Sequence, residues 1–265
     1  MKNRSKLIWR LITIAAVVFL LFSGVYFLFS STSDSKRLEQ ELIDRFGWAE
    51  QFVPVADGSI PPERLERFIR VRQAVQPACK DYQDVLDGIV GLAAIETEPE
   101  VSGSEAATRG IRGFKSVFNV GPRMLQFMDA RNSTLMSEGM GLGEYIYLYL
   151  TAYWEQLADV ASSPYFEMEE AHISSRTKEE FIQMLDNQLS ALGSAGPDEV
   201  RAGLKEEIAA LGESSDAVPW ARGLLPNTRK SLSPHQDQLS GLYCDGVVGI
   251  ELLQKNRGFG FWVRP

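Results

Sequence analysis

Hydrophobic and polar residues follow one another along most of this chain with the spacing of amphipathic helices. Apolar residues recur every three or four positions, and charged residues occupy the positions between them. No region shows several strands of alternating pattern. Segments with the helical pattern run over residues 33–46, 62–95, 142–157, 181–192, 199–211 and 234–254. The pattern predicts an all-α protein.

Prolines and glycines mark the expected ends of these helices. Pro77 predicts a kink or a restart within the segment 62–95, and Gly121-Pro122 predicts a break in the segment that follows it. Three glycines predict a further break before the most apolar stretch beyond the N-terminal region; they are Gly139, Gly141 and Gly143. With these boundaries we expect six to eight helices in residues 61–265.

The first thirty residues have a different pattern. Residues 11–30 contain no charged residue, and they are long enough to cross a hydrocarbon core of about 30 Å as a helix. The residues before them include four basic ones and no acidic one; the basic residues are Lys2, Arg4, Lys6 and Arg10. This asymmetry predicts a single transmembrane helix, a signal-anchor, with residues 1–10 in the cytoplasm and the rest of the chain outside it.

A cleaved secretory signal peptide is the alternative, with Ser31-Thr32-Ser33 as a weak cleavage site. The apolar run is longer than the 7–15 residues typical of a signal peptide, which favours the anchor. In both cases the bulk of the chain is exported, to a bacterial periplasm or the cell exterior. We expect a stalk helix and loop over residues 31–60 and an extracytoplasmic helical domain over residues 61–265.

The distribution of charge separates the two parts of the chain further. The whole chain has a formal net charge of −8, and residues 1–36 contain five basic residues and one acidic residue, so the remainder carries −12. An acidic body argues against nucleic-acid binding, which normally needs a basic face. The expected partners are therefore the membrane, through residues 11–30, and another membrane or envelope protein.

The stretch 142–157 contains the main candidates for a functional site. At helical spacing, Tyr145, Tyr149 and Tyr153 share one face, and Glu144 begins a narrow acidic stripe elsewhere. A carboxylate in an aromatic pocket is an arrangement used for general acid catalysis, which makes Glu144 a catalytic candidate and the tyrosines binding candidates. The structural interpretation, which we favour, is a central buried helix whose acidic residue meets solvent or an arginine of another helix.

Few other residues suggest chemistry. His172 and His235 lack the H-E-x-x-H or C-x-x-C spacing of metal sites, so we expect no metal and no cofactor. Cys79 and Cys244 form a disulfide or remain two buried thiols, and the sequence leaves both possibilities open. A run of arginines in one helix is typical of a solvated face; it comprises Arg64, Arg67, Arg70 and Arg72.

The sequence contains neither the G-x-S-x-G motif of serine hydrolases nor the Walker motif of nucleotide-binding proteins. The sequence therefore favours a non-catalytic, single-pass protein that binds a partner or helps an envelope assembly. The alternative is a membrane-tethered, hydrolase-like enzyme in which Glu144 acts as the acid or base.

Overall fold

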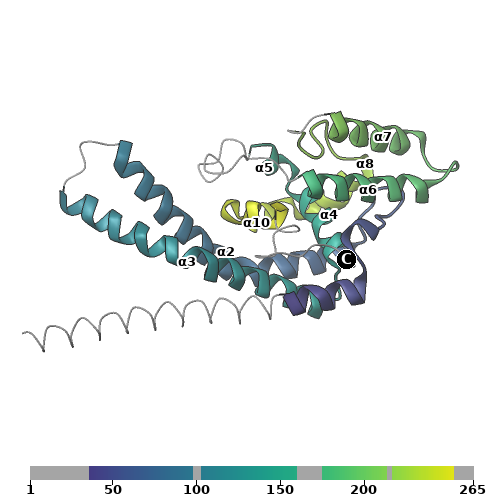
Figure 1. Ribbon diagram of the computed structural model, residues 1–265. Helices are drawn as coiled ribbons and strands as arrows, with labels where there is room; N and C mark the ends of the chain where they lie inside the picture. The colour runs from purple at the N-terminus through teal and green to yellow at the C-terminus, as the bar shows by residue number, and fades with distance from the viewer. Residues whose placement is uncertain (1–35, 98–102, 160–174, 214–216, 254–265) are drawn as a thin grey trace, which may run out of the picture.

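The computed structural model describes four stretches of the chain, which are residues 36–97, 103–159, 175–213 and 217–253. Their side chains are described as well, except those of residues 91–97 and 103–118, Ser175 and Leu253. Every regular element in these stretches is a helix, so the all-α prediction is confirmed. Figure 1 shows two long antiparallel helices, α2 and α3, which extend from a body that contains the shorter helices.

The first described helix covers residues 36–46 and ends at Gly47, which has a φ of +83°. The helices that follow are, in chain order, η1 (Ala49–Gln51), α2 (Pro62–Thr97), α3 (Gly103–Glu138), α4 (Leu142–Ala152), α5 (Trp154–Ala158), α6 (Ser175–Leu192), α7 (Asp198–Glu213), α8 (Pro226–Leu232), η3 (Ser233–His235), α9 (Gln236–Gly241), η4 (Asp245–Val247) and α10 (Val248–Leu253). The label η marks a 3₁₀ helix.

Helices α2 and α3 are each continuous over 36 residues. The predicted restart at Pro77 and the predicted break at Gly121-Pro122 are therefore wrong, because both prolines lie inside a continuous helix. A proline removes one backbone hydrogen bond and clashes with the preceding turn. Tertiary packing supplies most of the stability of a helix in a folded protein. Because α2 and α3 pack against each other, neither proline ends its helix.

Two other predicted helices are divided into shorter ones. The stretch 142–157 forms α4 and α5, which are separated at Tyr153 by a backbone conformation outside the helical range. The stretch 234–254 likewise contains η3, α9, η4 and α10. The described part of residues 61–265 therefore holds nine α-helices, α2 to α10, rather than six to eight.

The main core surrounds α4. Every residue from Leu142 to Thr151 is buried, which fits the expectation of a central helix. A second, smaller core joins α2 and α3 to the C-terminal segment and includes Val75, Cys79, Phe127, Cys244, Val247 and Ile250. The segment from Leu242 to α10 is thus held against the long hairpin.

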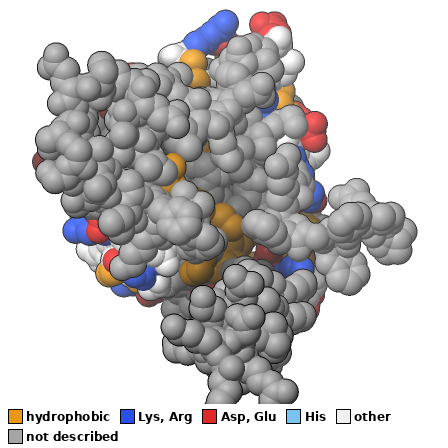
Figure 2. Space-filling model, turned by 60° about the vertical axis from the view of Figure 1, so that its left-hand side comes forward, with side chains coloured by type: hydrophobic (Ala, Val, Ile, Leu, Met, Phe, Trp, Pro, Cys, Tyr) orange, Lys and Arg blue, Asp and Glu red, His pale blue; other side chains and the backbone are white. Residues whose placement is uncertain are grey.

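The predicted anchor over residues 11–30 and the residue His172 lie outside the described residues. Among the helices that the structure does describe, none combines the length and the hydrophobicity that a membrane span requires. Figure 2 shows the side toward which α2 and α3 extend, and the described acidic and basic side chains visible there are interspersed rather than gathered by sign.

Candidate functional site

The three tyrosines that the sequence suggested as binding candidates form a row inside the core. Tyr145, Tyr149 and Tyr153 are at most 1% exposed. Their ring centroids are 6.1 Å apart between Tyr145 and Tyr149 and 5.0 Å apart between Tyr149 and Tyr153. Phe68 of α2 packs against the row, 5.6 Å from the Tyr145 ring. The helical spacing brings the tyrosines together as expected, but in the packed interior.

Glu144 lies in the first turn of α4, immediately before this row, and is only 9% exposed. Both of its carboxylate oxygens accept hydrogen bonds from Arg64 of α2, with Arg64 Nε 2.5 Å from Glu144 Oε1 and Nη2 bonded to Oε2. Arg64 Nη2 also donates to the carbonyl of Gly139 at 3.3 Å, next to the end of α3. A two-pronged arginine–carboxylate pair of this kind fixes geometry. It agrees with the structural interpretation of Glu144, and nothing in it favours an acid or base role.

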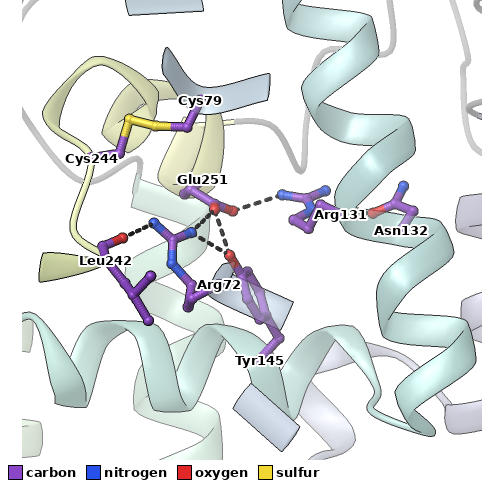
Figure 3. Close-up of polar contacts among 8 residues, drawn as sticks. All are labelled: Arg72, Cys79, Arg131, Asn132, Tyr145, Leu242, Cys244 and Glu251. Carbon is purple, nitrogen blue, oxygen red and sulfur yellow. Dashed lines mark hydrogen bonds and ion pairs between the residues drawn. A yellow bond between two sulfur atoms is a disulfide. The ribbon is translucent and has the colours of Figure 1, made fainter. Parts of the chain in front are cut away.

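Arg72 is the centre of a second and more deeply buried polar cluster. The sequence placed this arginine on a solvated face, and that expectation is wrong because Arg72 is 0% exposed. Figure 3 shows its guanidinium between Tyr145 and the C-terminal segment. Arg72 Nη1 donates to Tyr145 Oη and to Glu251 Oε1, each at 2.8 Å, and Nη2 donates to the carbonyl of Leu242 at 3.2 Å.

Glu251 of α10 is the acceptor on which this cluster converges. Tyr145 Oη donates to Glu251 Oε1 at 2.5 Å, and Arg131 Nη1 of α3 donates to Oε2 at 3.0 Å. Arg131 Nε donates in turn to Asn132 Oδ1 at 3.1 Å. Buried charges are costly unless they are paired and hydrogen-bonded. Four helices, α2, α3, α4 and α10, therefore meet at one carboxylate.

Two tyrosine rings cover the Arg72 guanidinium. Its Cζ lies 5.1 Å from the Tyr149 centroid and 5.3 Å from the Tyr153 centroid, which is the geometry of a cation–π contact. Burial raises the pKa of both Tyr145 and Tyr149 well above the ordinary value, and the charge of Arg72 offsets only part of that effect. Tyr145 is therefore neutral at physiological pH, and its hydroxyl donates to Glu251.

Cys79 and Cys244 are joined by a disulfide beside this cluster. Their Cα atoms are 6.5 Å apart and they are separated by 165 positions in the sequence. Cys79 lies about two helical turns after Arg72 on α2, and Cys244 lies two residues after Leu242, so the disulfide and the polar cluster hold the same C-terminal segment (Figure 3). Of the two possibilities that the sequence left open, the structure contains the pair.

The sequence did contain a signal for the burial of Arg72. The apolar stripe of α2 recurs every three or four residues, and its members are Leu65, Phe68, Arg72, Val75 and Cys79, all at most 1% exposed. A charged residue in the middle of such a stripe indicates a buried cation with a partner. The partner itself was not predictable, because Glu251 is 179 positions away.

A surface pocket of about 130 Å³ lies where α4 ends, next to α5, α8 and α9. Its lining residues are Ala152, Trp154, Glu155, Gln156, Leu224, Arg229, Leu232, Ser233, Gln236, Leu239 and Ser240. Neither Glu144 nor the tyrosine row contributes to it. The charged lining residues Glu155 and Arg229 are exposed, and the volume is below the roughly 300 Å³ typical of a small-molecule site.

A metal centre finds no support in the described residues, where no three His, Cys, Asp or Glu side chains lie close enough to share an ion. No family model, no curated protein and no solved structure matches this chain.

Proposed function

We propose that this protein is a single-pass membrane protein whose helical domain lies outside the cytoplasm and binds another membrane or envelope protein without catalysing a reaction. The main support for a location outside the cytoplasm is the Cys79–Cys244 disulfide. Disulfides persist in oxidising compartments and are rare in the cytosol. The basic residues before the apolar segment 11–30 support the same orientation.

The use of the buried polar groups supports a non-catalytic role. A catalytic acid, base or nucleophile must reach a substrate in a concave site. Glu144 is occupied on both oxygens by Arg64, and Glu251 is occupied by Arg72, Tyr145 and Arg131. These side chains connect helices to one another, which is the expected arrangement in a domain that presents a fixed shape to a partner.

The long hairpin supports partner binding. Helices α2 and α3 extend beyond the body in Figure 1, and this adds surface that the main core does not require. The charged side chains that Figure 2 shows in colour are of both signs, and the charge of −12 on residues 37–265 argues against nucleic acid as the partner. A folded protein partner, recognised by shape and local contacts, fits such a surface better.

Crosslinking of the full-length protein in its own membrane tests this proposal. We expect a discrete adduct of constant mass with a membrane or envelope protein, because a binding factor spends much of its time in a complex. A chain that starts at residue 31 is the control, and its adduct yield should fall because it is neither exported nor confined to the membrane. If reagents of several lengths give only uncrosslinked chain, the partner-binding proposal is wrong.

A further inference from the structure

Three exposed large hydrophobic side chains belong to one loop. Trp48 is 48% exposed, Val53 is 51% exposed and Val55 is 43% exposed. Among the residues whose side chains the structure describes, which exclude 91–118, no other large hydrophobic side chain is exposed to this extent. All three fall between positions 48 and 55. We name residues 47–60, which connect the first described helix to α2, the apolar loop.

Side chains of two helices, α6 and α8, form hydrogen bonds with the backbone of the apolar loop. From α6, Asn187 Nδ2 donates to the carbonyl of Glu50 and Gln188 Nε2 donates to the carbonyl of Val55, each at 2.9 Å. Side chains of α8 bind the second half of the loop. Asn227 donates to the carbonyl of Asp57 and Thr228 donates to the carbonyl of Gly58, while Ser231 accepts from the backbone N–H of Ile60. These contacts satisfy five of the polar backbone groups of the loop, whose one regular element is η1.

The same packing determines which side chains face outward. Phe52 packs on Tyr147, with ring centroids 5.7 Å apart, and Pro54 is buried, whereas Val53 and Val55 alternate with them and face solvent. The helix η1, at the start of the loop, contacts α4 closely. A Cβ atom added at Gly143 of α4 would overlap the backbone of η1. Apolar side chains presented on a fixed support, away from the core, mark a surface of contact.

We propose that the apolar loop rests on the lipid–water interface of the membrane in which the protein is anchored. This inference rests on the proposed anchor over residues 11–30. Between that segment and the loop lie only five residues and the helix over residues 36–46, which is about 16 Å long. Trp48 is therefore held within reach of the bilayer surface. Tryptophan is enriched at that surface because its ring is apolar and its N–H is polar.

The small size of the exposed surface fits lipid better than protein. A stable protein interface buries about 800 Å² on each partner, which is more than three half-exposed side chains on one loop supply. A tethered loop needs little affinity of its own, because the anchor keeps it at a high effective concentration near the bilayer. The charge of −12 on residues 37–265 gives no attraction to anionic lipid, so the contact depends on the apolar side chains.

Full-length protein in vesicles of zwitterionic phosphatidylcholine tests this inference. A nitroxide attached at Val53→Cys reports collisions with oxygen, which concentrates in lipid, and with a nickel chelate, which stays in water. The same label at Ala209→Cys, an exposed position on α7, is the matched control. We expect the ratio of oxygen to nickel collisions to be several-fold higher at position 53, and to fall to the control value when Trp48 and Val55 are replaced by serine.

Flotation of the vesicles after a high-salt wash tests the anchor independently of the docking of the loop. If the protein floats and nickel reaches both labels equally, the anchor stands and the docking is wrong. If the label at position 53 is shielded from both reagents, the loop contacts protein and the lipid proposal is wrong. If the protein does not float, both proposals are wrong.

A second measurement needs no added cysteine. The tryptophan fluorescence of the native chain minus that of the Trp48→Phe chain gives the Trp48 signal. Lipids brominated close to the headgroup should quench this signal, and an unquenched Trp48 in vesicles that carry the protein would overturn the docking.

Discussion

Arg72 Nη1 lies 2.8 Å from Glu251 Oε1, and this contact joins α2 to α10 across 179 positions of the sequence. Both side chains are at most 1% exposed. The carboxylate also accepts from Tyr145 and Arg131, so the cluster includes α3 and α4. Together with the Cys79–Cys244 disulfide, this ion pair fixes the C-terminal segment against the long hairpin.

Replacement of Arg72 by methionine should strongly destabilise the protein. The loss of one member of a buried ion pair typically costs about 3–5 kcal/mol, because its partner remains buried without the original compensation. Here Glu251 keeps Arg131 and Tyr145, so we expect the lower part of that range. Urea unfolding followed by circular dichroism measures the change.

Arg70→Met on the same helix is the matched control for Arg72→Met. The Arg70 side chain is 49% exposed, and it pairs with Glu138 at the surface at 2.9 Å. Solvent and salt screen such a pair, so we expect no measurable change in stability. Equal effects of the two substitutions would show that burial of the Arg72 cluster is not what stabilises the fold.

Two tyrosines of the same row should respond differently to removal of their hydroxyl groups. Tyr145→Phe removes the donor to Glu251 and the acceptor from Arg72, so it should cost about 1.5–3 kcal/mol. Tyr149→Phe removes a buried hydroxyl that has no hydrogen-bond partner in the described part of the chain, so stability should stay the same or rise slightly. The free energy of unfolding of each variant tests this prediction. A larger loss for Tyr149→Phe than for Tyr145→Phe would contradict the proposed role of the Tyr145 hydroxyl in the cluster.

Alkaline pH should unfold the protein through its buried tyrosines. Burial raises the pKa of Tyr145, Tyr147 and Tyr149 in the folded state, whereas an unfolded tyrosine ionises near pH 10. Above about pH 10 the unfolded state therefore binds fewer protons than the folded state, and stability falls as pH rises. Each such tyrosine contributes a slope of about 1.4 kcal/mol per pH unit.

Tyrosinate absorbance and circular dichroism, recorded together against pH, check the alkaline prediction. The ionisation of the buried tyrosines should coincide with the loss of helical signal. If all tyrosines ionise near pH 10 while the helical signal is intact, the tyrosine row is open to solvent and the predicted linkage is wrong.

Reduction of the disulfide should loosen the C-terminal segment and lower stability. The bond closes a long loop, for which the chain-entropy description gives a contribution of about 3–5 kcal/mol. A phosphine reductant should therefore lower the urea midpoint of the wild-type protein. The Cys79→Ser/Cys244→Ser variant should start at the lower midpoint and not respond to the reductant. Mass spectrometry should confirm that both thiols are reduced. If the urea midpoint of the reduced wild-type protein is then unchanged, the disulfide does not contribute the expected stability.

Features that depend on neighbouring residues were predictable from the sequence. The helical pattern gave the fold class, and the break at the glycines before the central helix is present, with Gly139 at a φ of +65° between α3 and α4. Glycine adopts this conformation without the steric cost that other residues pay, so its position in the sequence carries the information. That the three tyrosines lie on one face also followed from helical spacing.

Features that depend on distant residues were not predictable. Pro77 has the local property of a helix breaker, but the packing of α3 maintains the helix through it. Glu144 and Arg72 each carry a charge whose compensation comes from another helix, Arg64 in one case and Glu251 in the other. Which charges pair is set by the packing of helices, and the spacing within a single helix does not encode it.

The most direct test of the whole account is the side of the membrane on which the folded domain lies. Cells expressing the full-length chain with a C-terminal epitope are freed of outer barriers and treated with protease, and the epitope is followed in the membrane fraction. We predict that the epitope is lost while the cytoplasmic membrane is intact and a cytoplasmic marker survives. An epitope that stays protected until the membrane is opened would place the domain in the cytoplasm and contradict the account.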